Sequence, residues 1–441
     1  MITSIRLNSL CISLMSCVML APITAMAREN LFAISGDSPV QIHQPQFAAD
    51  IAQSTGRKKI TLNDRLLSAA AGDELDFVTL SGTSYTVIFD RFSKGGKSKT
   101  WVGHLKDYGI QHRVMITVNN NTIEGRISTP EGLMNIKSLN GELILMDYKA
   151  EGMQAMPFGD DSRLPEAEAL LPSADQPLSN EQNAITAAAA PSTVNGNTIV
   201  DVLVLYNDEF KARNNNPSTR IDYLTAVTNQ AYLDSQISMQ IRVVGTELIS
   251  YSNSLTNDNL LDAISSYFLA GKVAALRNQT GADLVIFIRP YQYSHGSCGL
   301  AMLNIYMNLS GTFATVSDGS DINGSGYYCS DVSFAHELGH TMGLAHDKAH
   351  ASYWGGRNPY SYGYGTQYQF GTIMSYTSPD VSLFSTPNLT SECLDYTCGS
   401  ADADNARSLT KDKAAISGLR NEVISHTTDV DLNSMYLLLL H

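Results

Sequence analysis

A run of twelve residues in the last third of the chain carries the side chains best suited to catalysis. The run is His336-Glu337-Leu338-Gly339-His340-Thr341-Met342-Gly343-Leu344-Ala345-His346-Asp347. Because positions four apart lie above one another on a helix, His336 and His340 would aim their imidazoles at one point. Neutral imidazole nitrogens suit a zinc ion. The spacing therefore predicts a metal site, with Glu337 one step round the helix.

A third ligand requires the chain to leave that helix. A helix continued past His340 would carry His346 to another face. Gly343 can adopt a positive φ and turn the chain, so that His346 completes a set of three histidines. Three protein ligands leave the fourth position open, which is typical of catalytic rather than structural zinc. We expect one catalytic Zn²⁺ on His336, His340 and His346, and the sequence does not address calcium.

The expected chemistry is hydrolysis of a peptide bond. Zinc lowers the pKa of water to roughly 7 and polarises a carbonyl group, so a nucleophile is available at neutral pH. Glu337 would take the proton from the attacking water and pass it to the leaving amine. Glu337 is therefore the predicted catalytic residue.

The segment resembles the signature of the metzincin metalloproteases, H-E-x-x-H-x-x-G-x-x-H followed by a Met-turn. A matching turn is Gly371-Thr372-Ile373-Met374-Ser375-Tyr376, and the resemblance implies that Met374 lies beneath the zinc site. Asp347 is similar to the aspartate that ties the metal loop to the domain in the adamalysin (reprolysin-like) branch. Within that branch the chain is similar to the bacterial peptidyl-Asp metalloendopeptidases.

The resemblance raises three further expectations about the substrate cleft. The segment Cys298–Ala301 resembles the edge strand that pairs with an extended substrate. A preference for aspartate just after the cut would require a basic group, for which Arg289 and Arg357 are unplaced candidates. Tyr376 resembles a tyrosine near the metal in astacins and serralysins, and a role as a ligand or oxyanion donor stands beside simple packing.

Other histidines near the motif are not expected to bind the metal. His350 follows a site that three histidines already satisfy. His295, beside Cys298, either lines the cleft or holds a loop, and we expect the loop role.

The start of the chain predicts export. Arg6, an apolar stretch from Leu10 to Leu20 and Ala25-Met26-Ala27 form the layout of a secretory signal peptide over residues 1–27. Cys17 leaves a lipoprotein anchor as the alternative. No later segment has the length of a membrane span, so we expect a secreted protein without a stable membrane anchor.

Four cysteines remain after the predicted cleavage, and they are Cys298, Cys329, Cys393 and Cys398. An even number in an exported protein indicates disulfides. Three pairings are open, of which we expect Cys393–Cys398 and Cys298–Cys329.

Composition divides the rest of the chain into four parts. Residues 28–152 hold short strand-like runs between turn signals and predict a small, mostly β propeptide domain. Residues 153–195 are rich in Pro, Ala, Ser, Asp and Glu and predict an exposed linker in which maturation cleavage occurs. Residues 196–426 predict the zinc metalloprotease domain, and 427–441 a tail of no assigned role.

The expected catalytic fold is α/β (α+β), a mixed, mostly parallel sheet with an active-site helix. Ile199–Leu205, Met239–Leu248 and Leu284–Ile288 are predicted strands. Leu260–Leu276 is predicted as one helix, and Leu409 to Val423 as another.

The propeptide is the expected inhibitor of the enzyme. It contains no cysteine that could block the zinc ion. Phe158-Gly159-Asp160 resembles the segment whose aspartate blocks zinc in astacin proforms, which gives Asp160 as the hypothetical blocking residue.

The net charge limits the classes of molecule that the protein is expected to bind. A formal net charge of −14 excludes a typical nucleic-acid binder, so we expect protein or peptide substrates. Two alternatives remain: an inactive metzincin-fold binding or toxin module, and a zinc hydrolase acting on something other than peptides. The intact Glu337 argues against the first, and the edge strand and proregion against the second.

Overall fold

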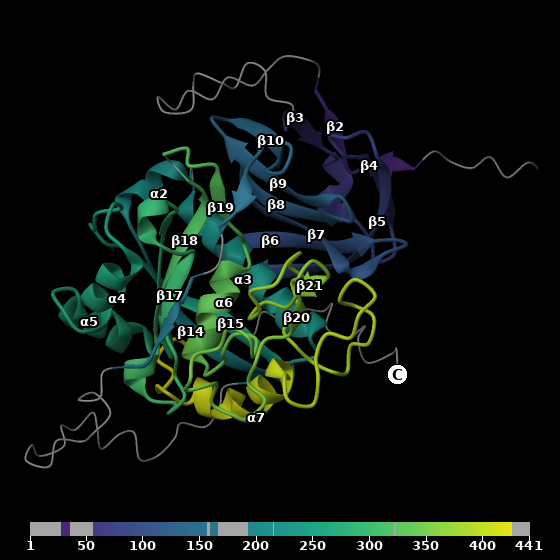
Figure 1. Ribbon diagram of the computed structural model, residues 1–441. Coiled ribbons are helices and arrows are strands. Elements are labelled where there is room, and N and C mark those ends of the chain that lie inside the picture. Colours follow the sequence, from purple (N-terminus) through teal and green to yellow (C-terminus); the bar gives the residue numbers. More distant parts are fainter. Residues whose placement is uncertain are drawn as a thin grey trace, which may run out of the picture.

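The computed structural model describes residues 28–35, 56–156, 159–165, 193–214, 216–321 and 323–425. The predicted signal peptide, most of the predicted linker and the C-terminal tail lie outside these residues. Within them, no helix is both long and apolar enough to cross a membrane. Two bodies pack against each other, an N-terminal β domain and a mixed α/β domain (Figure 1).

The N-terminal domain is a ten-stranded sheet in the order β1-β4-β5-β6-β7-β8-β9-β10-β3-β2. Its strands are β1 (Glu29–Asn30), β2 (Phe32–Ile34), β3 (Arg57–Leu62), β4 (Glu74–Val78), β5 (Ser84–Gly95), β6 (Ser98–Leu105), β7 (Gly109–Asn119), β8 (Thr122–Thr129), β9 (Gly132–Leu139) and β10 (Glu142–Asp147). Only Leu31 separates β1 from β2, which pair with opposite ends of the sheet, so the sheet closes into a barrel. Closure removes exposed strand edges. We call this domain the barrel.

The second domain is built on a mostly parallel sheet, as its hydrophobic pattern predicts. Strands β14 (Asn197–Tyr206), β15 (Met239–Leu248), β16 (Leu284–Pro290) and β18 (Phe313–Ser320) run parallel to one another. Strands β17 (Gly299–Met302) and β19 (Tyr327–Cys329) pair with β18 in the antiparallel direction, and β13 (Thr193–Val194) pairs with β14 in the same way.

Alternate residues of β14 face two different hydrophobic cores. Val202 and Val204 face one core with α3 (Pro217–Asp234), α6 (Ser333–Thr341) and α7 (Asn405–Ser417). Leu203 and Leu205 face the other, with α4 (Asn257–Ser265) and α5 (Ala270–Thr280). The remaining elements are α2 (Asp208–Arg213) and a small hairpin of β20 (Gly365–Thr366) and β21 (Phe370–Gly371). Because β14 is covered on both faces, its apolar run is almost continuous.

Two predicted helices are wrong in their extent. The helix predicted over Leu409 to Val423 ends at Ser417, so Val423 lies beyond it. Residues 260–276 form parts of two helices, because α4 ends at Ser265 and α5 begins at Ala270. The turn between them carries Tyr267 and Phe268, whose side chains are exposed. The aromatic residues give the run an apolar content that resembles a continuous helix face, although they point to solvent.

The barrel docks on α3 through both apolar and charged contacts. The side chains of Val102 and Met115 belong to the hydrophobic core that includes α3 rather than to the interior of the barrel. Arg113 binds the carboxylate of Asp234 at the end of α3, with its Nε 2.8 Å from Oδ2. Ser98 donates a hydrogen bond of 2.6 Å to Asp222. The strands β5 to β8 therefore contact the mixed α/β domain along one face of α3 (Figure 1).

The beginning of the predicted linker is not an exposed connection. Strand β11 (Gln154–Ala155) pairs with β19, and β12 (Ser162–Arg163) pairs with β17, both in the parallel direction. Residues 154–155 and 162–163 thus add two strands to the sheet of the second domain. Backbone pairing offsets the low hydrophobicity of this stretch, which composition alone does not reveal.

Both expected disulfides are present. Cys298 and Cys329 join the residue before β17 to the end of β19, and Cys393 pairs with Cys398. The first bond fixes the antiparallel part of the sheet beside α6.

Candidate active site

Helix α6 carries the first two predicted ligands and ends where the sequence predicts. Its last residue is Thr341, and Gly343 follows with a φ of 84°. The Gly343 amide donates to the carbonyl oxygen of His340 over 2.9 Å. Glycine adopts this left-handed conformation without steric cost, so the chain reverses and returns His346 toward the helix.

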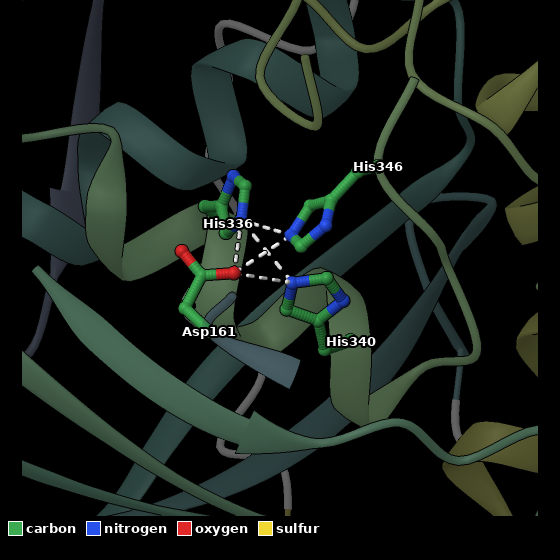
Figure 2. Close-up of side chains that lie close together, drawn as sticks. All are labelled: Asp161, His336, His340 and His346. Atoms are coloured by element: carbon green, nitrogen blue, oxygen red, sulfur yellow. Dashed lines mark hydrogen bonds and ion pairs between the residues drawn. The ribbon is translucent and has the colours of Figure 1, made fainter. Parts of the chain in front are cut away.

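The three histidine side chains converge on one point, and a carboxylate joins them (Figure 2). The Nε2 atom of His336 lies 3.2 Å from that of His340 and 3.3 Å from that of His346. Asp161 Oδ1 lies 2.7 Å from His346 Nε2 and 3.3 Å from His340 Nε2. All four residues are buried.

The arrangement fits a tetrahedral metal ion. Ligand bonds of about 2.0–2.1 Å place tetrahedral donor atoms about 3.4 Å apart, close to most of the separations here. Backbone carbonyl groups accept hydrogen bonds from the far ring nitrogens: Ile373 O lies 2.6 Å from His336 Nδ1, and Leu344 O lies 2.8 Å from His340 Nδ1. These contacts keep the proton on Nδ1 and leave the Nε2 lone pairs for a metal. The donor set therefore suits zinc.

Glu337 lies beside this cluster in a dry environment. Burial, and then the negative charge of Asp161, raise the pKa of the Glu337 carboxyl well above its usual range. Its Oε2 atom is buried and has no hydrogen-bond partner among the described residues. A carboxylate desolvated in this way is a stronger base than one in water.

The Met-turn lies directly beneath α6. A Cβ atom added to Gly339 would approach the sulfur of Met374 to 2.6 Å, so the methionine packs closely on the helix at this glycine. Asp347 joins the loop of His346 to this turn, because its Oδ2 accepts from the Tyr376 amide at 2.9 Å and the Ser375 hydroxyl at 3.1 Å. Met374 thus lies against α6, and Asp347 links the His346 loop to the turn that carries Met374.

The fourth group of the cluster comes from the predicted linker, and the sequence hypothesis missed it by one residue. Asp161 faces the histidines, whereas Asp160 is exposed. The amide of Ala301 in β17 donates to the Asp161 carbonyl oxygen over 3.0 Å, which fixes the register. Burial opposes ionisation of Asp161, but the His336 and His346 imidazoles hold its pKa well below the usual range.

Two adjacent aspartates were the only sequence signal for this residue. Which of them faces the cluster depends on the register of β12 against β17, two segments more than a hundred residues apart. No local pattern encodes that register.

Tyr376 also points into the site. Its hydroxyl oxygen lies 2.6 Å from Asp161 Oδ1 and 2.5 Å from the carbonyl oxygen of Gly159. Its ring packs on His346 with centroids 4.1 Å apart. Tyr376 therefore both packs on a histidine and holds the segment that carries Gly159 and Asp161.

The remaining candidates lie outside the cluster. His350 binds Asp347 at 2.8 Å, and His295 is buried between Ser317 and Asn253 as the loop role requires. Arg289 is fully buried and donates to Asn257, while Arg357 donates to the carbonyl oxygen of Ile305. Neither arginine is among the described residues that line the cavity beside the histidines.

The comparisons with known proteins agree with this geometry. Residues 197–406 match the family described as Metallo-peptidase family M12B Reprolysin-like, and residues 38–149 match the BamI lipocalin-like domain. A peptidyl-Asp metalloendopeptidase of Stenotrophomonas maltophilia is 28% identical over 320 residues, which cover 70% of each chain. A protein of the same name from Pseudomonas aeruginosa is 29% identical over 269 residues, covering 56% of this chain and 43% of the relative.

Among solved structures, metalloproteinase-II from Bacteroides fragilis aligns with 64% of this chain and 84% of its own. The TM-score is 0.38 at 10% identity.

Proposed function

Residues 197–406 form a reprolysin-like zinc metalloprotease domain of the M12B family, and from this premise we propose that the chain is a secreted proenzyme of a metalloendopeptidase. His336, His340 and His346 hold the catalytic zinc ion, and Glu337 acts as general base and acid. The convergence of three Nε2 atoms beside a desolvated carboxylate carries the proposal. The signal-like residues 1–27 support export.

A few groups carry out the proposed reaction, and each has a separate role. Bound zinc would supply a Lewis acid that activates water and polarises the peptide carbonyl. Glu337 takes a proton from the attacking water and delivers it to the departing amine. The edge strand β17 binds the extended substrate by backbone pairing. Tyr376, once released from Asp161, is placed to donate a hydrogen bond to the developing oxyanion.

The propeptide is the inhibitor in this proposal. Asp161 takes the fourth position of the metal site, and β12 occupies the strand edge that a substrate would use. Access to the metal and access to the edge are thus blocked together. Cleavage between Pro165 and Thr193, followed by release of the N-terminal fragment, gives the active enzyme.

The first test replaces the base. Glu337→Gln keeps the shape of the side chain but cannot accept the proton, so we expect peptide cleavage by the matured enzyme to fall by about 10²–10⁴-fold. Zinc content, measured by metal analysis, should stay at one ion per chain. A zinc chelator should abolish the activity of the unaltered enzyme. Cleavage that survives either treatment contradicts the assignment.

The second test concerns latency and uses neighbouring aspartates. In the uncleaved chain, Asp161→Ala removes the carboxylate from the metal site, so turnover of a short peptide should rise above that of the unaltered proform. Asp160→Ala is the matched control, because Asp160 is exposed, and it should leave the proform inactive. Equal activity of the two variants would refute the role of Asp161.

A further inference from the structure

A cavity lies beside the proposed catalytic groups and is bordered by His336 and Glu337. Three segments of the catalytic domain form its walls: the approach to β17, the stretch from β19 to α6, and the chain around the Met-turn. Asp380 is among the residues that these segments contribute to the lining. The location next to the base makes it the site for a side chain adjoining the scissile bond.

In the proform this cavity is partly filled by the propeptide. Ala155, Met156, Gly159 and Asp161 contribute to its lining. All four leave with the propeptide, so the mature enzyme would present a larger pocket at the same place. The walls that remain determine which substrate side chain fits.

The charge of those walls is negative. Apart from the catalytic pair His336 and Glu337, Asp380 is the charged residue that the catalytic domain contributes to the lining, and no lysine or arginine is among the described lining residues. Asp380 is an exposed residue that lines the cavity, although its carboxyl group is largely withdrawn from water. Its position is fixed, because the flanking Pro379 and Val381 form backbone hydrogen bonds of 2.9 and 2.8 Å with Gly371.

The barrel supplies a positive charge to this carboxylate. Burial raises the pKa of the Asp380 carboxyl to about 6, and the charges of His336 and of Arg126, which is buried in β8, oppose that rise. Two guanidinium nitrogens of Arg126, Nε and Nη1, are buried without a hydrogen-bond partner in the described part of the chain. Release of the barrel takes Arg126 away and leaves Asp380 facing the pocket without it.

We propose that Asp380 selects substrates with lysine or arginine adjoining the scissile bond. The inference rests on the proposed function of the site. A cationic side chain would pair with Asp380 in a recess partly shielded from water, where charge-assisted hydrogen bonds are strong. An aspartate in the same place would meet a like charge and be rejected. The preference thus differs from the one in the names of the relatives.

The test measures cleavage of peptides that differ at one position. The enzyme matured from the full-length chain is given peptides with Lys, Arg, Asn or Asp at each position in turn, and the cut sites are identified by mass spectrometry. We expect kcat/KM for Lys or Arg adjoining the cut to exceed that for Asp by about tenfold or more. Asp380→Asn should remove most of this ratio, and Asp380→Arg should reverse it.

A matched control and a binding measurement make the outcome specific. Glu209→Gln removes an exposed carboxylate of α2 outside the cavity and should leave the ratio unchanged. Matured Glu337→Gln measures peptide affinity without turnover, so a basic preference in binding can be scored even if cleavage fails. A preference for Asp, or a ratio that Asp380→Asn does not alter, overturns the inference. Loss of cleavage with intact basic preference in binding would instead count against the proposed function.

Discussion

Gly299 shows how a residue with no reactive group makes room for one that has it. A Cβ atom at this position would lie 2.2 Å from Glu337 Oε1, far inside contact distance. The edge strand therefore approaches α6 closely only because this residue is glycine. The carboxylate that needs the space is the predicted general base.

Gly299→Ala should therefore impair catalysis more than folding. The end of a flexible glutamate side chain can move, so we expect a nearly unchanged melting temperature but a fall in kcat of about tenfold or more as Glu337 leaves its productive position. Zinc content should be retained. Gly271→Ala in α5 is the control, since its added Cβ meets no atom within 4 Å. A fully active Gly299→Ala enzyme would contradict the close fit.

At the scale of elements, the end of α6 decides whether three histidines can meet. Gly343 combines a left-handed φ of 84° with a crowded position, where an added Cβ would lie 2.7 Å from Arg357 Cβ. An alanine must therefore shift the backbone of the turn. That turn aims His346 at the other two imidazoles.

Gly343→Ala is expected to weaken zinc binding by about tenfold or more, and to destabilise the domain by about 1 kcal/mol or more. Gly281→Ala is the matched control: Gly281 ends α5 with a φ of 71°, is equally crowded, and lies outside the metal cluster. Both variants should melt earlier, but only the first should release zinc to a competing chelator at lower concentration. Equal zinc affinities would show that the turn does not position His346.

The elements also show which parts of the fold and of the site can be predicted from the sequence. The helical spacing of His336 and His340 is a local property, and so is the glycine that ends α6, which made the three-histidine cluster predictable. The parallel strands were predictable because double-sided burial leaves an apolar run. The pairing of β12 with β17 was not, since it depends on partners distant in the chain, and Asp160 was chosen where Asp161 lies in the site.

At the scale of the whole molecule, the association of the two domains is expected to depend on pH. Asp222 on α3 is covered by the barrel, and burial raises the pKa of its carboxyl to about 6, although Ser98 hydrogen-bonds it. In the separated catalytic domain the carboxyl would return toward its ordinary 3.8. The docked state therefore binds the proton more tightly than the separated state.

This difference in proton affinity determines the direction in which docking changes with pH. The contribution of Asp222 to docking is fully present below about pH 4 and is lost as the pH rises through about 6. A shift of about 2 units corresponds to at most about a 100-fold weaker complex at neutral pH. We expect the cleaved propeptide to dissociate faster at about pH 7.5 than at about pH 5, as size-exclusion chromatography can measure. Asp222→Asn should flatten this profile, and an unchanged profile in the variant would exclude Asp222 as its source.

The strand in the cleft and the barrel on α3 belong to one continuous stretch of chain, and this has a consequence for the timing of activation. A cut after Pro165 leaves both contacts on one fragment, which then binds the protease as a bivalent ligand. When one contact opens, the other keeps the opened segment at a high effective concentration near its site. Cutting alone would then produce a dormant complex, and activity would appear after a lag set by destruction or escape of the barrel. Such a delay would let the chain travel away from its producer before it begins to digest protein.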